Sequence, residues 1–70
     1  MEWTREKPTQ EGGLYLVQRM HEWVITAFRV KRGDWRQRQD PSRLYVGDEP
    51  VEEVNAAFLG PLPDPPNKYT

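Results

Sequence analysis

The 70-residue sequence has no cysteine and only one histidine, His21. The lack of cysteine excludes disulfides and thiolate metal sites, and a single histidine leaves little for a metal centre or a histidine-based catalytic site. No apolar run approaches the roughly 20 residues that a membrane-spanning helix needs. The first ten residues also lack the basic and then apolar order of a secretory signal. These absences predict a cytoplasmic protein that holds no metal or cofactor and does not bind membranes.

Apolar residues are also scarce, at 36% of the chain. A domain of this length hides only about 60% of the surface that its unfolded chain exposes, so its core is thin. Since no disulfide can supplement that core, association with another chain is the usual source of extra stability. We therefore expect a homodimer, or a chain that gains stability from a partner.

The main structural signal is the alternation of side chains in residues 13–39, which predicts three antiparallel strands. Residues 14–19 alternate clearly, residues 23–30 form the longest run of strand-favouring residues, and residues 35–39 resemble a polar edge strand. Residues 19–22 are expected to form a hairpin connection, and residues 31–34 a turn around Gly33. The run 23–30 begins with apolar residues on both faces, so this strand is expected either to be central and covered on both sides or to have one face covered by a second subunit.

The segment 50–59 allows two interpretations. Val51, Val54 and Phe58 are spaced as on one face of a helix, with Pro50 in its first turn and Gly60 after its end. Alternatively, residues 56–62 form a last strand; the pattern alone favours the helix. The predicted fold is mainly β, a small antiparallel sheet of three to four strands, with a short helix near residues 50–59 as the α+β alternative.

Four prolines in residues 61–66 predict an extended C-terminal tail, because proline lacks the amide donor that helices and central strands use. The predicted organisation is one β domain over residues 1–60, followed by a proline-rich tail over residues 61–70.

Charge is distributed unevenly although the net charge is −1. Residues 29–43 carry six cations and two acids, whereas residues 44–70 carry five acids and one cation. The simple interpretation is a solvated surface, and the alternative is a surface for a charged partner. Arginine can pair with carboxylate or phosphate, and an indole can stack on a base or hold a cation. The candidate binding residues are Arg29, Lys31, Arg32, Trp35, Arg36 and Arg38.

A second group of residues, Tyr15, Trp23 and Ile25, is a candidate for a dimer interface or for a pocket shared by two subunits. The sequence has no glycine-rich phosphate loop before a helix, no metal-ligand cluster and no nucleophile beside a candidate base. No catalytic or metal-binding residue is assigned, and we expect a protein that is not an enzyme.

The ending FLGPLPDPP, residues 58–66, has a recognisable form. It follows a tryptophan near the start, a proline and then glycines before LYLV at residues 14–17, and a second strand that ends in a turn and a tryptophan. This combination resembles short phage and prophage proteins classed as a domain of unknown function, in which an aromatic-containing strand precedes Pro-Leu-Pro-acidic-Pro-Pro. The family typically has His-Trp where this chain has Phe58-Leu59, so no role is transferred to that pair.

The resemblance implies a strand rather than a helix at residues 56–62, and a phage or prophage accessory protein that acts in the bacterial cytoplasm. The expected function is to bind and inhibit a host protein with an acidic surface, in the context of antiviral defence. The alternative is a dimeric sponge that sequesters a nucleotide signal. A nucleic-acid-binding module is a second alternative, which the net charge and the acidic C-terminal third disfavour.

Overall fold

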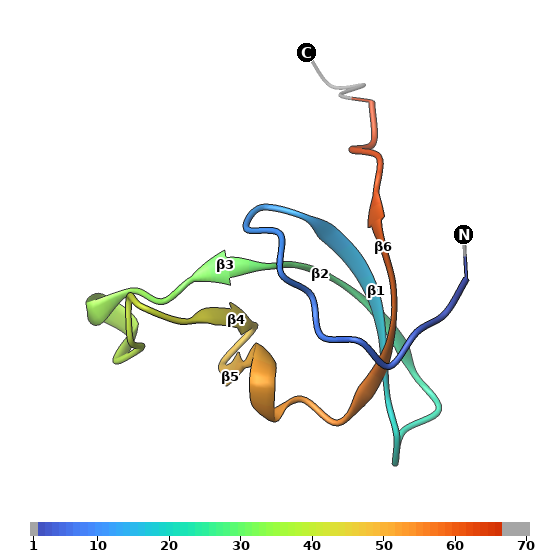
Figure 1. The fold of residues 1–70 in the computed structure, drawn as a ribbon, viewed down its shortest axis with the longest axis horizontal. Helices are drawn as coiled ribbons and strands as arrows, with labels where there is room; N and C mark the ends of the chain where they lie inside the picture. Colours follow the sequence, from blue (N-terminus) through green and yellow to red (C-terminus); the bar gives the residue numbers. More distant parts are fainter. Residues whose placement is uncertain (1, 67–70) are drawn as a thin grey trace.

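The computed structural model describes residues 2–66, which form two small antiparallel sheets (Figure 1). The first sheet has the strand order β2-β1-β6, and its strands are β2 (Ile25–Arg29), β1 (Leu14–Arg19) and β6 (Ala56–Leu62). The protein is therefore mainly β and antiparallel, as predicted. Within the described part of the chain, no helix is long and apolar enough to cross a membrane.

The second sheet is smaller and has the order β3-β4-β5. Its strands are β3 (Lys31–Arg32), β4 (Leu44–Val46) and β5 (Glu49–Pro50). Two single 3₁₀ turns complete the fold, η1 (Trp35–Gln37) between β3 and β4 and η2 (Val51–Glu53) between β5 and β6.

Strands β2 and β3 are two halves of one bent strand with Val30 at the bend. The Val30 N–H donates to the carbonyl of Gly13 (2.9 Å), and the Val30 carbonyl accepts from the Gly12 N–H (2.7 Å), so Val30 still bonds to the β1 side. The next residue, Lys31, lies opposite Tyr45 of β4. The strand thus changes partners at Val30 and links the two sheets.

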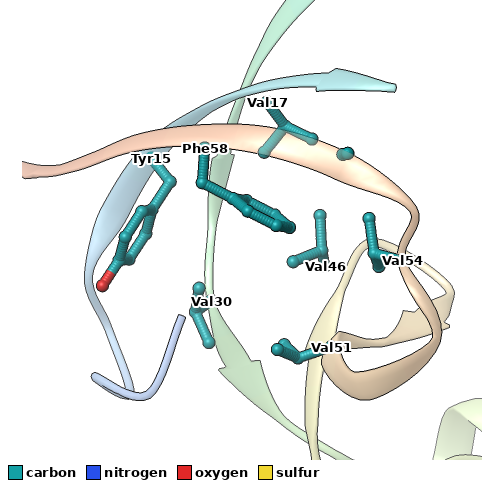
Figure 2. Close-up of a cluster of buried hydrophobic side chains, with 8 residues drawn as sticks. Tyr15, Val17, Val30, Val46, Val51, Val54 and Phe58 are labelled. Carbon is teal, nitrogen blue, oxygen red and sulfur yellow. The ribbon is translucent and has the colours of Figure 1, made fainter. Parts of the chain in front are cut away.

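The core lies between the two sheets and consists largely of valines, with the aromatic rings of Phe58 and Tyr15 (Figure 2). β1 alternates as the sequence pattern predicts, and the structure shows that Tyr15 and Val17 are on the buried face. Phe58 of β6 is fully buried and lies among side chains from both sheets. The buried cluster comprises Tyr15, Val17, Val30, Val46, Val51, Val54, Ala56 and Phe58.

The predictions for residues 23–39 need correction. Residues 31 and 32 form β3 rather than a turn, because they pair with β4. Residues 35–39 do not form a strand: residues 35–37 form η1, which the Asp34 side chain caps by accepting a hydrogen bond from the Arg36 N–H (2.9 Å). Such a local side-chain bond offers the backbone an alternative to strand pairing. At the other end, β2 begins at Ile25, so Trp23 and Val24 lie outside the strand.

Residues 50–59 do not form a helix. The structure has one 3₁₀ turn, η2, and then the strand β6, which pairs with β1 from Arg19 opposite Ala56 to Leu14 opposite Leu62. Pairing with β1 buries Ala56 and Phe58 by alternation, which the helical spacing did not anticipate. The strand interpretation is therefore confirmed for residues 56–62.

β6 runs two residues beyond the predicted domain boundary at residue 60 and includes Pro61. Proline is compatible with this position because β6 lies at the edge of its sheet. Residues 63–66 follow the last strand, and residues 67–70 of the predicted tail lie outside the described residues.

The buried ring of Phe58 is expected to dominate stability. Phe58→Ala should lower the free energy of unfolding by about 3–5 kcal/mol, because it removes a fully buried ring and leaves a cavity. Trp35→Ala truncates a ring that is 74% exposed and should change stability by no more than about 0.5 kcal/mol. Urea unfolding followed by circular dichroism compares the two, and equal effects would contradict this description of the core.

Candidate functional site

A loop between β3 and β4, residues 33–40, carries three of the predicted binding residues, and we call it the Trp35 loop. Its two ends touch. A side-chain carbon at Gly33 would lie 2.0 Å from the carbonyl oxygen of Asp40, so only glycine allows this approach. The Asp40 N–H also donates to the hydroxyl of Tyr45 (2.9 Å), which ties this end of the loop to β4.

Inside the Trp35 loop, short hydrogen bonds fix the backbone. The carbonyl of Asp34 accepts from the N–H groups of Gln37 (2.9 Å) and Gln39 (3.0 Å). Gln39 is the buried polar side chain of the described residues, 8% exposed, and its amide Nε2 donates to the carbonyl of Gly47 (3.1 Å). The loop is therefore anchored to the turn between β4 and β5 as well as at its ends.

This anchored loop holds three large side chains in solvent. Trp35 is 74% exposed, and Arg36 and Arg38 are also exposed. Among the contacts within residues 2–66, neither guanidinium has a hydrogen-bond or ion-pair partner. Arg38 has a φ of 59°, in the left-handed region that glycine occupies most easily. The loop thus presents an indole and two cations whose charges are free to pair with another molecule.

The other three predicted residues lie along β2 and β3. Arg29, Lys31 and Arg32 help to line a hollow of about 460 Å³ whose wall also includes Gln37 and Gln39 of the Trp35 loop. Trp35, Arg36 and Arg38 are not among its lining residues. The structure therefore divides the six predicted residues into two groups, one on the Trp35 loop and one at the hollow.

Two arginines of the hollow already bind within the chain. Arg29 donates from Nη1 to the Asp64 carboxylate (2.9 Å) and to the carbonyl of Gly12 (2.8 Å). Arg32 donates from Nε and Nη2 to the Glu11 carboxylate (3.0 and 2.7 Å) and from Nη1 to the carbonyl of Pro41 (3.1 Å). These two cations fasten the N-terminal and C-terminal segments to the sheet. Lys31 has no such partner in the part of the chain that the structure describes.

The predicted dimer or pocket group is also divided. Tyr15 is buried in the core, at 6% exposure, so it does not reach a surface where a second subunit could use it. Trp23 is 96% exposed and Ile25 52% exposed, near the tip and on the edge of the β1–β2 hairpin. That hairpin and the Trp35 loop lie at opposite ends of the molecule (Figure 1).

The C-terminal end of the Trp35 loop is held by charges. The Asp40 carboxylate accepts from the Ser42 N–H (2.9 Å) and from the Ser42 hydroxyl (2.7 Å). These bonds, the backbone one foremost, hold the pKa of Asp40 below its usual value. Arg43 donates to Glu53 (3.1 Å) and Glu52 (3.2 Å) of η2. The bond to Glu53 is the main reason why the pKa of Arg43 is raised.

Sequence reasoning found the exposed side chains of this loop but missed what holds them. The polar neighbourhood of Gln39 gives no sign that its amide is buried, since glutamine is mostly exposed. The sequence placed Tyr45 only in a short apolar stretch. Its hydroxyl accepts a hydrogen bond from the Asp40 N–H, a contact that depends on how the loop folds back onto β4. Across residues 2–66, no group of three or more His, Cys, Asp or Glu side chains is placed to hold a metal ion.

Comparisons with known proteins give no match: no family model, no curated protein and no solved structure is similar enough to this chain to be identified with it.

The close approach of Gly33 to Asp40 predicts a cost for any side chain there. Gly33→Ala should lower the free energy of unfolding by about 1–3 kcal/mol, because the added methyl group overlaps the Asp40 carbonyl. Gln37→Ala, on the exposed part of the same loop, should change it by no more than about 0.5 kcal/mol. Urea unfolding of both variants is the test, and an unperturbed Gly33→Ala protein would mean that the loop ends do not touch.

The hydroxyl of Ser42 predicts a change in the titration of Asp40. Ser42→Ala should raise the pKa of Asp40 without restoring its ordinary value, because the stronger backbone bond remains. Folding lowers this pKa, so the stabilisation is complete above the pKa of an unfolded aspartate, about 3.9, and is lost as the pH falls through the folded-state pKa. Carboxyl NMR titration measures the shift. Ser42→Thr keeps the hydroxyl and should leave the pKa low, and equal titrations in all three proteins would exclude this contact.

Proposed function

We propose that the protein is a non-enzymatic binding module that docks the Trp35 loop onto an acidic surface of another protein. Tryptophan and arginine dominate the energetics of protein interfaces, and the Trp35 side chain, 74% exposed, is available to a partner. Arg36 and Arg38 add two free cations beside it, which suit carboxylates. The anchored ends of the loop support the proposal because a loop that is already ordered loses little entropy on binding.

The backbone of Arg38 is the observation that carries the proposal. Glycine would adopt its φ of 59° at little cost, whereas an arginine there costs about 1–2 kcal/mol by the usual left-handed penalty. No intramolecular bond of the Arg38 side chain, within the described residues, offsets this cost. The Arg38 backbone ends η1 by donating its N–H to the carbonyl of Trp35 (3.0 Å), a task that glycine would perform at less cost. A left-handed arginine whose side chain binds nothing within residues 2–66 is a reason to assign that side chain a role in binding.

The nature of the partner comes from the sequence resemblance. Similarity to short phage and prophage proteins supports a host bacterial protein as the target, and occupation of its acidic surface would inhibit it. In this proposal the protein acts in the bacterial cytoplasm and counters a host function, such as antiviral defence, by occupying a surface rather than by chemistry.

The test is native mass spectrometry of the tagged protein, expressed in bacteria and purified at low ionic strength. The wild-type chain should carry one stoichiometric protein companion. Trp35→Ala and the double variant Arg36→Glu/Arg38→Glu should lose it while remaining folded by circular dichroism. Arg5→Glu, compared with the single variant Arg36→Glu, makes the same charge change at an exposed arginine elsewhere and should keep the companion. A companion that all variants retain would contradict the assignment of the site.

Arg38→Gly separates the role in binding from the role in folding. Glycine relieves the left-handed conformation, so the variant should be as stable as the wild-type protein or more stable, by up to about 1 kcal/mol. It should nevertheless bind the companion at least tenfold more weakly, as measured by titration calorimetry. A destabilised Arg38→Gly protein with normal binding would show that the arginine serves the fold.

The hollow beside β3 supports sequestration of a small anion, such as a nucleotide, as a second candidate function. Its volume of about 460 Å³ lies within the range of small-molecule sites, and Lys31 has a free charge at its wall. Against this, Arg29 and Arg32 would have to exchange Asp64 and Glu11 for the ligand. A nucleotide-sized adduct in the native spectrum, lost from Lys31→Glu and kept by Arg36→Glu/Arg38→Glu, would favour this candidate over protein binding.

A further inference from the structure

Strand β2 lies at one edge of the sheet β2-β1-β6, and its outer side has no partner strand among the described residues. The bonds of Val30 to Gly12 and Gly13 show that its N–H and carbonyl face β1. Because these groups alternate along an antiparallel strand, those of Ile25, Ala27 and Arg29 face away from β1. The protein thus presents a short row of unpaired backbone donors and acceptors.

This edge lacks the usual protection against pairing. Soluble proteins protect edge strands with charges, prolines or bulges. Residues 23–27, WVITA, contain none of these, and all five are exposed. Trp23 is 96%, Val24 62% and Ile25 52% exposed. An unprotected edge of this kind indicates a surface that is covered when the protein functions.

The other edge of the same sheet is covered. Thr4 pairs with Phe58 of β6 through two backbone bonds (2.9 and 2.8 Å), and Pro61 lies further along the same strand. The chain therefore protects one edge with its own N-terminal segment and leaves the edge of β2 open.

We infer that β2 pairs antiparallel with β2 of a second copy of this chain, about a twofold axis at Ile25. This register is self-complementary. Ile25 lies opposite its own copy, and the indole of Trp23 lies opposite Ala27, whose small side chain leaves room for it. Two three-stranded sheets then become one six-stranded sheet, and an interface of this type is the same surface patch on both copies.

The charges that flank the segment fit antiparallel pairing. Glu22 precedes the uncharged run and Arg29 follows it. In this register Glu22 of one copy lies opposite Phe28 of the other, next to Arg29, so the acidic end of each run lies beside the basic end of the other, whereas parallel pairing would align like charges. This complementarity favours a second copy of the chain over a strand of an unrelated protein.

The turn between β4 and β5 restricts the register. A side-chain carbon on Gly47 would lie 3.3 Å from the ring of Phe28, so this turn lies close beside the C-terminal half of β2. Pairing centred on Ile25 uses residues 23–27 and avoids the turn. Trp23 and Val24 precede β2, so this pairing would extend the strand by two residues. The Trp35 loop lies at the far end of the molecule, so both copies keep it exposed (Figure 1). The dimer consequently does not depend on the proposed function, nor the proposed function on the dimer.

Sedimentation equilibrium of the purified chain tests the association without any partner protein. The wild-type protein should show a concentration-dependent mass that approaches twice 8.3 kDa. Ile25→Lys puts a charge on the axis and should raise the dissociation constant at least tenfold. Gln37→Lys adds the same charge on the Trp35 loop and should leave the constant unchanged.

A second variant tests the backbone edge itself. Ala27→Pro removes an N–H that faces away from β1, so the β1–β2 ladder keeps its hydrogen bonds while the dimer loses one at each end. It should remain folded by circular dichroism and sediment as a monomer. Hydrogen exchange gives a residue-specific measurement: the amides of Ile25 and Ala27 should be protected only at high protein concentration, and that of Thr26 at all concentrations.

Three results would overturn the inference. The first is a wild-type protein that remains a monomer at millimolar concentration. The second is a dimer that Ile25→Lys and Ala27→Pro both leave intact, since this would place the interface elsewhere. The third is protection of Ile25 and Ala27 that does not depend on concentration, since the edge would then be covered within one chain.

Discussion

The two sheets share one strand, and its bend at Val30 is the constraint on which the rest of the structure depends. Before the bend the strand bonds to β1, and after it the strand bonds to β4. Val30 itself is fully buried, so the change of partner takes place inside the core. Because the backbone turns there, β4 and β5 lie across the first sheet, and the valines of the two sheets can close around Phe58. Both sheets therefore share one small core.

The same bend determines where the unpaired backbone lies. β4 pairs with the bent strand only from Lys31 onward. The earlier half of that strand, β2, therefore has β1 on one side and, among the described residues, no strand on the other. The two surfaces that carry the proposals arise from this arrangement. The hairpin and edge of β2 lie before the bend, and the Trp35 loop follows after it, so the two proposed binding surfaces are separate.

The sequence was sufficient for the elements that depend on local alternation. The predicted strand over residues 14–19 and its alternation agree with the structure because period-two alternation is a local property, but the pattern did not say which face is buried, and Tyr15 lies in the core rather than at an interface. The sequence indicated Trp35, Arg36 and Arg38 as binding candidates without deciding whether Trp35 is buried, and the structure places all three in solvent.

The sequence did not supply the features that depend on hydrogen bonds and strand pairing outside the alternation of side chains. The 3₁₀ turn η1 replaced a predicted strand because Asp34 caps it locally, and β3 replaced a predicted turn because β4 pairs with it. The spacing of Val51, Val54 and Phe58 suited a helix equally well, and only pairing with β1 decided for β6. The burial of Gln39 likewise depends on the position of Gly47, which no pattern near Gln39 reveals.

The contact between Gly33 and Asp40 has a consequence for how this protein can vary. The first and last residues of the Trp35 loop are in contact, so the two sheets do not determine the path of the backbone between them. The closure entropy of a loop rises by only about 0.6 kcal/mol for each doubling of its length. Insertions between Asp34 and Arg38 would break the hydrogen bonds of η1 but leave the sheets and the core in place, provided that Gln39 and Gly33 keep their positions. If the loop binds as proposed, exchanges of its exposed side chains would change the target while the rest of the domain stays constant.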